Sequence, residues 1–142
     1  VWRMSLIPPG RIDHIGIAVR DLNLARTTYE SILGAELSGC EVVEQQGVEV
    51  AFMQLPGDTR VELIAPTDRH GAVARFLDTH GEGMHHICMM VEDSEETLAV
   101  LEKAQVPLVD KEPRRGAEGS RIAFVHPASL GGVLLELKQK AN

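Results

Sequence analysis

Two histidines and two glutamates recur at matching places in the two halves of the sequence. His14 precedes Glu62 by 48 residues, and His86 precedes Glu136 by 50 residues. Each glutamate lies inside an apolar stretch, where a carboxylate is costly to bury unless it is paired, protonated or bound to a cation. Two imidazoles and two carboxylates make an N₂O₂ donor set suited to a divalent first-row metal, with positions left for water or substrate.

Each of these residues has an alternative interpretation when it is taken singly. Either glutamate could lie on the solvated face of an edge strand, and a lone strand histidine is more often a core or surface residue than a ligand. His85 competes with His86 as the ligand, because neighbouring residues of a strand point to opposite faces. The repeated spacing of the four residues favours a metal site formed by His14, Glu62, His86 and Glu136.

The four candidate ligands belong to an internal sequence repeat. Four residues recur unchanged 72 positions later: His14, Ile15, Val19 and Asp21 return as His86, Ile87, Val91 and Asp93. The order strand, helix, three strands also occurs twice, in modules of about 11–66 and 83–138 joined by a linker helix of about 70–80. We therefore expect an α+β fold in a single domain, 1–142, whose two paired βαβββ modules form a curved, mostly antiparallel sheet around a metal cleft.

The apolar periodicity and the turn residues give the expected element bounds. In the first module we expect a helix capped by Asp21 and ended by Gly34, and strands over 11–19, 37–45, 48–55 and 60–65. In the second module we expect a helix capped by Asp93, and strands over 87–91, 106–109, 121–125 and 133–137.

Composition excludes several classes of function. The formal net charge of −7 makes non-specific nucleic-acid binding unfavourable, and no apolar run has the 18 or so residues that span a bilayer. Cys40 and Cys88 are too few for a disulfide framework and are expected to be reduced core thiols in a cytoplasmic protein. The opening residues 1–4 lack the apolar segment of a signal peptide.

Five motifs resemble the vicinal-oxygen-chelate, or glyoxalase-like, superfamily and, within it, the methylmalonyl-CoA epimerase family. They extend from about residue 11 to 138: Arg11-Ile-Asp-His-Ile-Gly-Ile-Ala-Val19, Val61-Glu-Leu63, Gly83-Met-His-His-Ile87, Gly119-Ser-Arg-Ile-Ala-Phe-Val-His-Pro127 and Gly131-Gly-Val-Leu-Leu-Glu-Leu137. The first two are shared across the superfamily. The paired histidines and the segment 112–136, which contains Pro113-Arg-Arg-Gly116, are closer to the epimerases.

The resemblance implies a metal-dependent epimerisation. The expected ligands are His14, Glu62, His86 and Glu136, the ion is Co²⁺, Mn²⁺, Zn²⁺ or Ni²⁺, and the assembly is a homodimer. The reaction interconverts the (2R) and (2S) forms of methylmalonyl-CoA by removing the C2 proton, through an enolate that the metal stabilises.

Two proton carriers are needed, one on each face of the enolate. Glu136 is the preferred base. Some family members have a second glutamate three residues after the glycine that corresponds to Gly47, where this chain has Val50. Glu49 is adjacent, but strand alternation turns it to the opposite face unless a bulge intervenes. A water on the metal or Glu62 is left as the second carrier.

The densest cationic stretch is the expected contact for an acyl-CoA. It contains Lys111, Arg114, Arg115 and Arg121. Phosphate or the substrate carboxylate would bind the three arginines, whereas a solvated loop balanced by Asp110, Glu112 and Glu118 is the alternative.

Three other functions compete with the epimerase. A glyoxalase I-like lactoylglutathione lyase would use a similar donor set, and the epimerase-like segment 112–136 argues against it. An extradiol-type oxygenase needs only His14, His86 and Glu136, and a fourth ligand would occupy a position that O₂ requires. A non-catalytic module that binds a small apolar molecule needs a cleft and no metal.

Overall fold

The computed structural model describes residues 5–141, and the described residues form two compact units. One unit is Asp13–His86, called here the first unit. The described residues before and after it form the second unit. The expectation that the chain opens without a signal peptide falls on residues 1–4, which lie outside the described residues.

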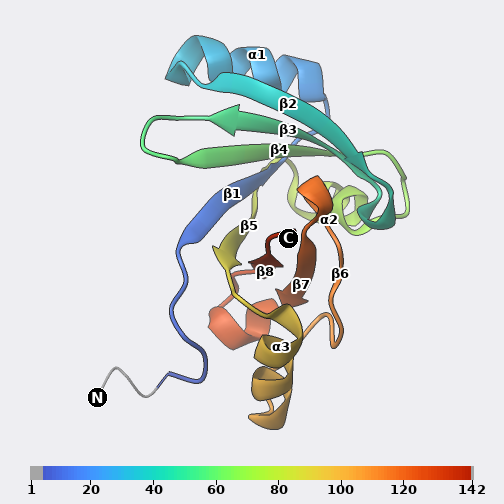
Figure 1. Cartoon of the computed structure of the whole chain (residues 1–142). Helices are drawn as coiled ribbons and strands as arrows, with labels where there is room; N and C mark the ends of the chain where they lie inside the picture. Colours follow the sequence, from blue (N-terminus) through green and yellow to red (C-terminus); the bar gives the residue numbers. More distant parts are fainter. Residues whose placement is uncertain (1–4, 142) are drawn as a thin grey trace. The chain divides into compact units, whose positions relative to one another are not determined.

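The first unit is a mixed sheet with two helices (Figure 1). Its strands are β1 (Ile12–Ala18), β2 (Glu36–Val43), β3 (Val48–Gln54) and β4 (Arg60–Pro66), and its helices are α1 (Leu22–Leu33) and α2 (Ala72–His80). In space the strands run β1-β4-β3-β2, with β1 parallel to β4 and the other pairs antiparallel. This register places Gly16 of β1 and Phe52 of β3 on either side of Glu62 in β4.

The second unit repeats this topology. Its helix is α3 (Ser94–Lys103), and its strands are β6 (Arg114–Arg115), β7 (Arg121–Val125), β8 (Leu135–Gln139) and the latter half of β5 (Gly83–Met90). The strands run β5-β8-β7-β6, with β5 parallel to β8. Cys88 and Phe124 flank Glu136, just as Gly16 and Phe52, each 72 positions earlier, flank Glu62. The predicted order of strand, helix and three strands is thus confirmed in both modules.

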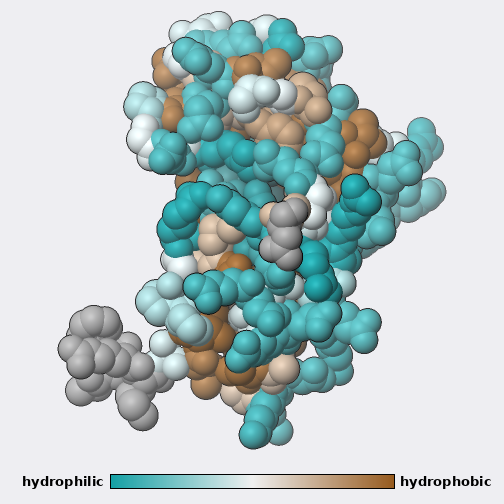
Figure 2. Space-filling model, viewed as in Figure 1, coloured by the Kyte–Doolittle hydropathy of each residue, from teal (hydrophilic) through white to brown (hydrophobic). Residues whose placement is uncertain are grey.

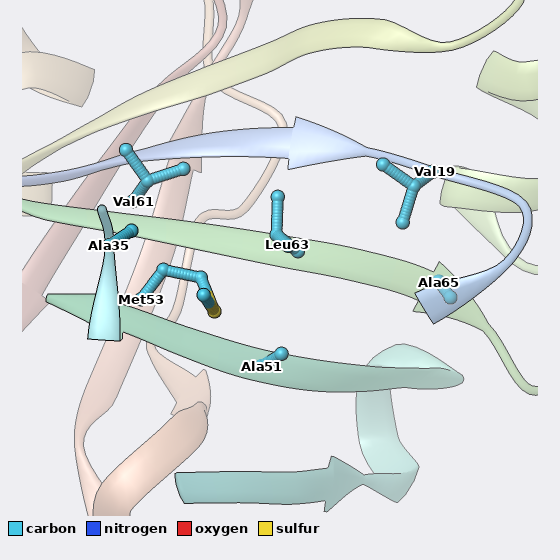
Figure 3. Close-up of a cluster of buried hydrophobic side chains, with 7 residues drawn as sticks. All are labelled: Val19, Ala35, Ala51, Met53, Val61, Leu63 and Ala65. Atoms are coloured by element: carbon cyan, nitrogen blue, oxygen red, sulfur yellow. The ribbon is translucent and has the colours of Figure 1, made fainter. Parts of the chain in front are cut away.

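Helix α1 covers one face of the first unit's sheet and buries its core there (Figure 1). Asp21 accepts a hydrogen bond from the Leu24 N–H, and Gly34 ends the helix at a φ of 68°, as predicted. The buried core cluster gathers on this face of β3 and β4 (Figure 3): Val19, Ala35, Ala51, Met53, Val61, Leu63 and Ala65. Because strand residues alternate, Gly16, Phe52 and Glu62 lie on the other face.

The second unit has its own core beneath α3. Asp93 caps this helix by accepting from the Glu96 N–H. The core consists of Leu98, Leu101, Ala123, Val125 and Leu137.

Two predictions about local structure are wrong. Residues 106–109 form no strand, only the single bridge between Leu108 and Val125, and the first strand after α3 is Arg114–Arg115. Pro107 has no N–H to donate, and the N–H groups of Val109 and Asp110 both bond to the carbonyl of Phe124, so the segment bends away from a ladder. Cys40 is exposed on β2, the last strand in the first unit's order, whereas Cys88 is buried as expected.

Hydrophilic residues cover most of the face shown in Figure 2, and hydrophobic residues appear there in small groups. None of the helices within residues 5–141 combines the length and apolar character needed to cross a membrane.

Equivalent leucines test whether both modules depend on equally tight cores. Leu63 and Leu137 are fully buried in β4 and β8. We expect Leu63→Ala and Leu137→Ala each to lower the free energy of unfolding by about 2–5 kcal/mol, through lost burial and a residual cavity. Urea denaturation measures this, with Leu24→Ala on the exposed side of α1 as the control. A loss below about 0.5 kcal/mol in either core variant, the range of surface changes, would contradict the packing described.

Candidate metal centre

Two buried imidazoles of the first unit approach each other through their Nε2 atoms. His14 of β1 and His86 of β5 are 4% and 7% exposed, and their Nε2 atoms lie 3.1 Å apart. Two imidazole nitrogens bound to one ion at 2.0–2.1 Å are separated by about 2.8–3.4 Å when the angle at the metal is between square and tetrahedral. The observed spacing therefore fits two ligands of one divalent cation.

A glycine in β1 makes this approach possible. Gly16 lies beside the His86 ring, and a Cβ at this position would fall inside van der Waals contact of three ring atoms. Real Cβ atoms do not come so close to neighbouring atoms, so any larger residue would push the ring away. The space that holds His86 thus exists because residue 16 has no side chain.

The far nitrogen of His14 contacts two carboxylates. Nδ1 lies 2.8 Å from Asp13 Oδ2 and 3.0 Å from Glu62 Oε2. A carboxylate on one ring nitrogen holds the hydrogen there and leaves the lone pair on the other nitrogen, as in the outer contacts of metal-bound histidines. Asp13 and Glu62 therefore direct the Nε2 lone pair of His14 toward His86.

Arg60 completes this buried charged group. Its guanidinium lies 2.7 Å from Glu62 Oε2 and 3.4 Å from Asp13 Oδ2, and 4.9 Å above the Phe52 ring. One guanidinium thus lies beside both of the carboxylates that contact His14. Buried carboxylates are stable only when they are paired in this way or bound to a cation.

Glu136 is buried in the second unit. It is 6% exposed, in β8, between Cys88 of β5 and Phe124 of β7. Glu62 is 4% exposed at the equivalent register position of the first unit. The solvated-edge alternative is therefore wrong for both glutamates. Within the first unit, Glu62 reaches His14 at Nδ1, the nitrogen turned away from His86, and Glu136 belongs to the second unit.

The position of the family's second base holds an apolar residue. Val50 is buried, directly opposite Ile64, on the face of the sheet that also carries Glu62. Glu49 faces the other way, into a pocket of about 430 Å³ that α1 and Ala51 also line. The irregularity between β2 and β3 lies between Leu37 and Gly39, so no bulge turns Glu49 around.

The candidate acyl-CoA contacts lie in the second unit, where several of the cations have acidic neighbours. Arg114 pairs with Asp110 at 3.4 Å and lies 5.5 Å from the Phe124 ring centroid, and Arg121 pairs with Glu95 at 2.6 Å. Arg115 stands directly opposite Arg121 in the β6–β7 pair. Residues directly opposite each other on paired strands share a face of the sheet, so these two side chains start from the same face.

Three residues of this arrangement were missed from the sequence alone, and His85 was considered only as a rival ligand to His86. Arg60 could have been inferred, because a residue two positions before Glu62 on a strand shares its face. Asp13 directly precedes His14, and strand alternation gives no indication that the two side chains meet. The role of Gly16 could not be predicted from the sequence, because it depends on the register that places this residue beside His86.

The chain matches a known family over most of its length. Residues 13–124 match the family described as the glyoxalase/bleomycin resistance protein/dioxygenase superfamily. The chain belongs to this superfamily, and the predicted fold of paired βαβββ modules, the vicinal-oxygen-chelate fold, is the superfamily's own.

Similar proteins identify the family within this superfamily. The mitochondrial methylmalonyl-CoA epimerase of Homo sapiens is 39% identical over 140 residues, 98% of this chain and 76% of that protein. The ethylmalonyl-CoA/methylmalonyl-CoA epimerase of Cereibacter sphaeroides is 38% identical over 132 residues, 92% of this chain and 98% of that protein. A solved methylmalonyl-CoA epimerase in complex with methylmalonyl-CoA and NH4+ has a TM-score of 0.88 and 39% identity, covering 94% of this chain and 96% of that one. Within the superfamily, the chain belongs to the methylmalonyl-CoA epimerase family.

Substitution of Gly16 tests the geometry of the two histidines. We expect Gly16→Ala to displace the His86 ring and to weaken Zn²⁺ binding at least about tenfold, the scale seen when a ligand loses its support. Isothermal titration calorimetry of the metal-free protein measures the affinity. Gly39→Ala is the matched control, because its Cβ would meet only ordinary contact, 3.9 Å from Phe52. Equal affinities in the two variants would contradict the role assigned to Gly16.

Proposed function

We propose that the chain epimerises methylmalonyl-CoA at C2 with a divalent cation held by His14, Glu62, His86 and Glu136. The observation that carries the proposal is the buried imidazole pair, whose Nε2 atoms lie 3.1 Å apart, with two buried carboxylates behind His14. The relatives' printed activities and the methylmalonyl-CoA in one solved neighbour support the substrate. The ion is Co²⁺, Mn²⁺, Zn²⁺ or Ni²⁺, since all four accept imidazole and carboxylate ligands. The family resemblance adds a homodimer to the proposal.

The substrate explains why a cation is needed. The C2 proton lies between a thioester and a carboxylate, and its loss creates an enolate with negative charge on oxygen. A bound divalent cation supplies the Lewis acid that stabilises this charge. Asp13 and Glu62 hold the hydrogen of His14 on Nδ1 and so fix its Nε2 in one orientation, so that little reorganisation is required during turnover.

Glu136 is the proposed proton carrier on one face of the enolate. Its carboxylate is buried in β8, between strands that carry Cys88 and Phe124 opposite it, so bulk water has little access. On the second face of the enolate, residue 50 is a valine and cannot carry a proton. We assign the role of second proton carrier to Glu62 or to water. His14 Nδ1 lies 3.0 Å from Glu62, so this imidazole is the neighbour with which the carboxylate can exchange a proton, whereas Arg60 keeps its protons and only holds the carboxylate in place.

Isotope exchange tests the reaction class. We expect the metal-loaded protein to introduce deuterium at C2 of methylmalonyl-CoA in D₂O, and a chelator to stop the exchange. Glu136→Gln keeps an oxygen donor but removes the base, and should slow exchange by about 10²–10⁴-fold, the usual contribution of a general base. NMR of the substrate measures the rate.

Assays of the same sample distinguish the epimerase from the alternative functions. Conversion of a glutathione hemithioacetal, or oxygen uptake with a catechol, in place of C2 exchange would replace the proposal with the lyase or the oxygenase. If the protein binds no metal and exchanges no proton, the non-catalytic binding module would replace the epimerase as the proposed function.

The cross-strand arginines are the proposed anion contact for the acyl-CoA. We expect Arg115→Ala combined with Arg121→Ala to raise KM for methylmalonyl-CoA and to weaken its dependence on salt, because two cations near a phosphate are lost. Lys103→Ala at the exposed end of α3 is the control. Steady-state kinetics at two ionic strengths measures both effects. An unchanged KM and salt dependence in the double variant would exclude this surface.

A further inference from the structure

We propose that His85 is a positioning residue, which fixes the orientation of the His86 ring by accepting a hydrogen bond from its Nδ1, and that Phe76 of α2 holds His85 in place. The inference rests on the proposed function in one respect, namely that His86 is a metal ligand. All of the residues involved belong to the first unit.

The contact between the two neighbouring histidines is a hydrogen bond of ordinary length. Their Nδ1 atoms lie 2.9 Å apart, and their rings are nearly perpendicular, at 88°. A hydrogen bond between two nitrogens needs the hydrogen on one and a lone pair on the other. His86 must keep its Nε2 lone pair for a cation, so its hydrogen is on Nδ1 and His85 Nδ1 accepts.

This assignment explains the spacing of the imidazole pair. His14 has its hydrogen on Nδ1, facing Asp13 and Glu62. With His86 in the same tautomer, two Nε2 lone pairs face each other at 3.1 Å. Two lone pairs at this distance repel unless a cation binds them both, so the contacts behind the rings prepare the site for an ion.

Helix α2 supports His85 from behind. The Phe76 ring meets the His85 ring at 81° with centroids 4.8 Å apart, and His80 stacks on the same Phe76 at 4.7 Å. Perpendicular and offset aromatic pairs at these distances are attractive. The helix itself is anchored by its buried residues, Val73, Ala74 and Leu77, and by a hydrogen bond from Arg20 to the Leu77 carbonyl at 3.1 Å.

The position of His85 next to His86 has a chemical consequence. His14 contacts carboxylates, whereas His86 contacts a neutral ring. A third carboxylate at this place would add negative charge to a buried group that already holds two. A neutral acceptor orients His86 without that cost.

Two substitutions separate the hydrogen bond from the packing. His85→Phe keeps a ring against Phe76 but removes the acceptor, and His85→Gln supplies an amide oxygen that can accept. We expect His85→Phe to weaken Zn²⁺ affinity by about 10–100-fold, the usual effect of losing an outer partner of a ligand, and His85→Gln to recover most of it. His70→Phe, at an exposed histidine, is the matched control.

A second readout is independent of metal and of activity. Long-range ¹H–¹⁵N spectra of the metal-free protein report which ring nitrogen of His86 carries hydrogen. We expect the Nδ1–H form in the wild type and in His85→Gln, and a mixture of both forms in His85→Phe.

The outcomes distinguish this inference from the proposed function. A wild type that binds no Zn²⁺ would overturn the metal-dependent function, while the tautomer spectra still decide the role of His85. A wild type that binds Zn²⁺ with the same affinity as His85→Phe would overturn the positioning role alone. Equal losses of affinity in His85→Phe and His85→Gln would also overturn it, since they indicate damage to packing. Thermal unfolding of each variant identifies such damage directly.

Discussion

The close approach of two buried imidazoles is the constraint on which the rest of the site depends. His14 and His86 come from strands that are far apart in sequence, and their Nε2 atoms lie 3.1 Å apart because Gly16 leaves room for the second ring. Each ring is held from behind, His14 by carboxylates and His86 by a neighbouring histidine. Polar groups buried in this way are stable only when all of their hydrogen bonds are made, which keeps the two rings in a single orientation.

The buried charged groups of the site are paired with neighbouring side chains. The chain is acidic as a whole, yet Arg60 lies between Asp13 and Glu62 and reduces the repulsion between these two buried carboxylates. The duplicated module carries an equivalent acid, because the register that buries Glu62 opposite Phe52 also buries Glu136 opposite Phe124. Duplication therefore yields one buried carboxylate in each unit, and the local side chains give the two different surroundings.

Sequence periodicity predicted the parts of this account that follow from backbone regularity. The repeat of 72 residues, the caps at Asp21 and Asp93 and the topology of both modules depend on apolar spacing and turn chemistry, which are local properties. The contact of His85 with His86 depends on side-chain conformation, and the place of Gly16 beside the His86 ring depends on register, neither of which spacing specifies. Residues 106–109 have apolar content typical of a strand, but Pro107 and the shared carbonyl of Phe124 prevent a ladder.

X-ray absorption spectroscopy of the Zn²⁺-loaded protein tests the central claim most directly, because scattering from imidazole carbons counts the histidines bound to the ion. The account predicts two histidines per metal, with nitrogen and oxygen ligands at about 2.0–2.2 Å and no sulfur. His14→Ala and His86→Ala should each reduce the count to one. A single histidine in the wild type, or a sulfur ligand from Cys88, would contradict the shared site.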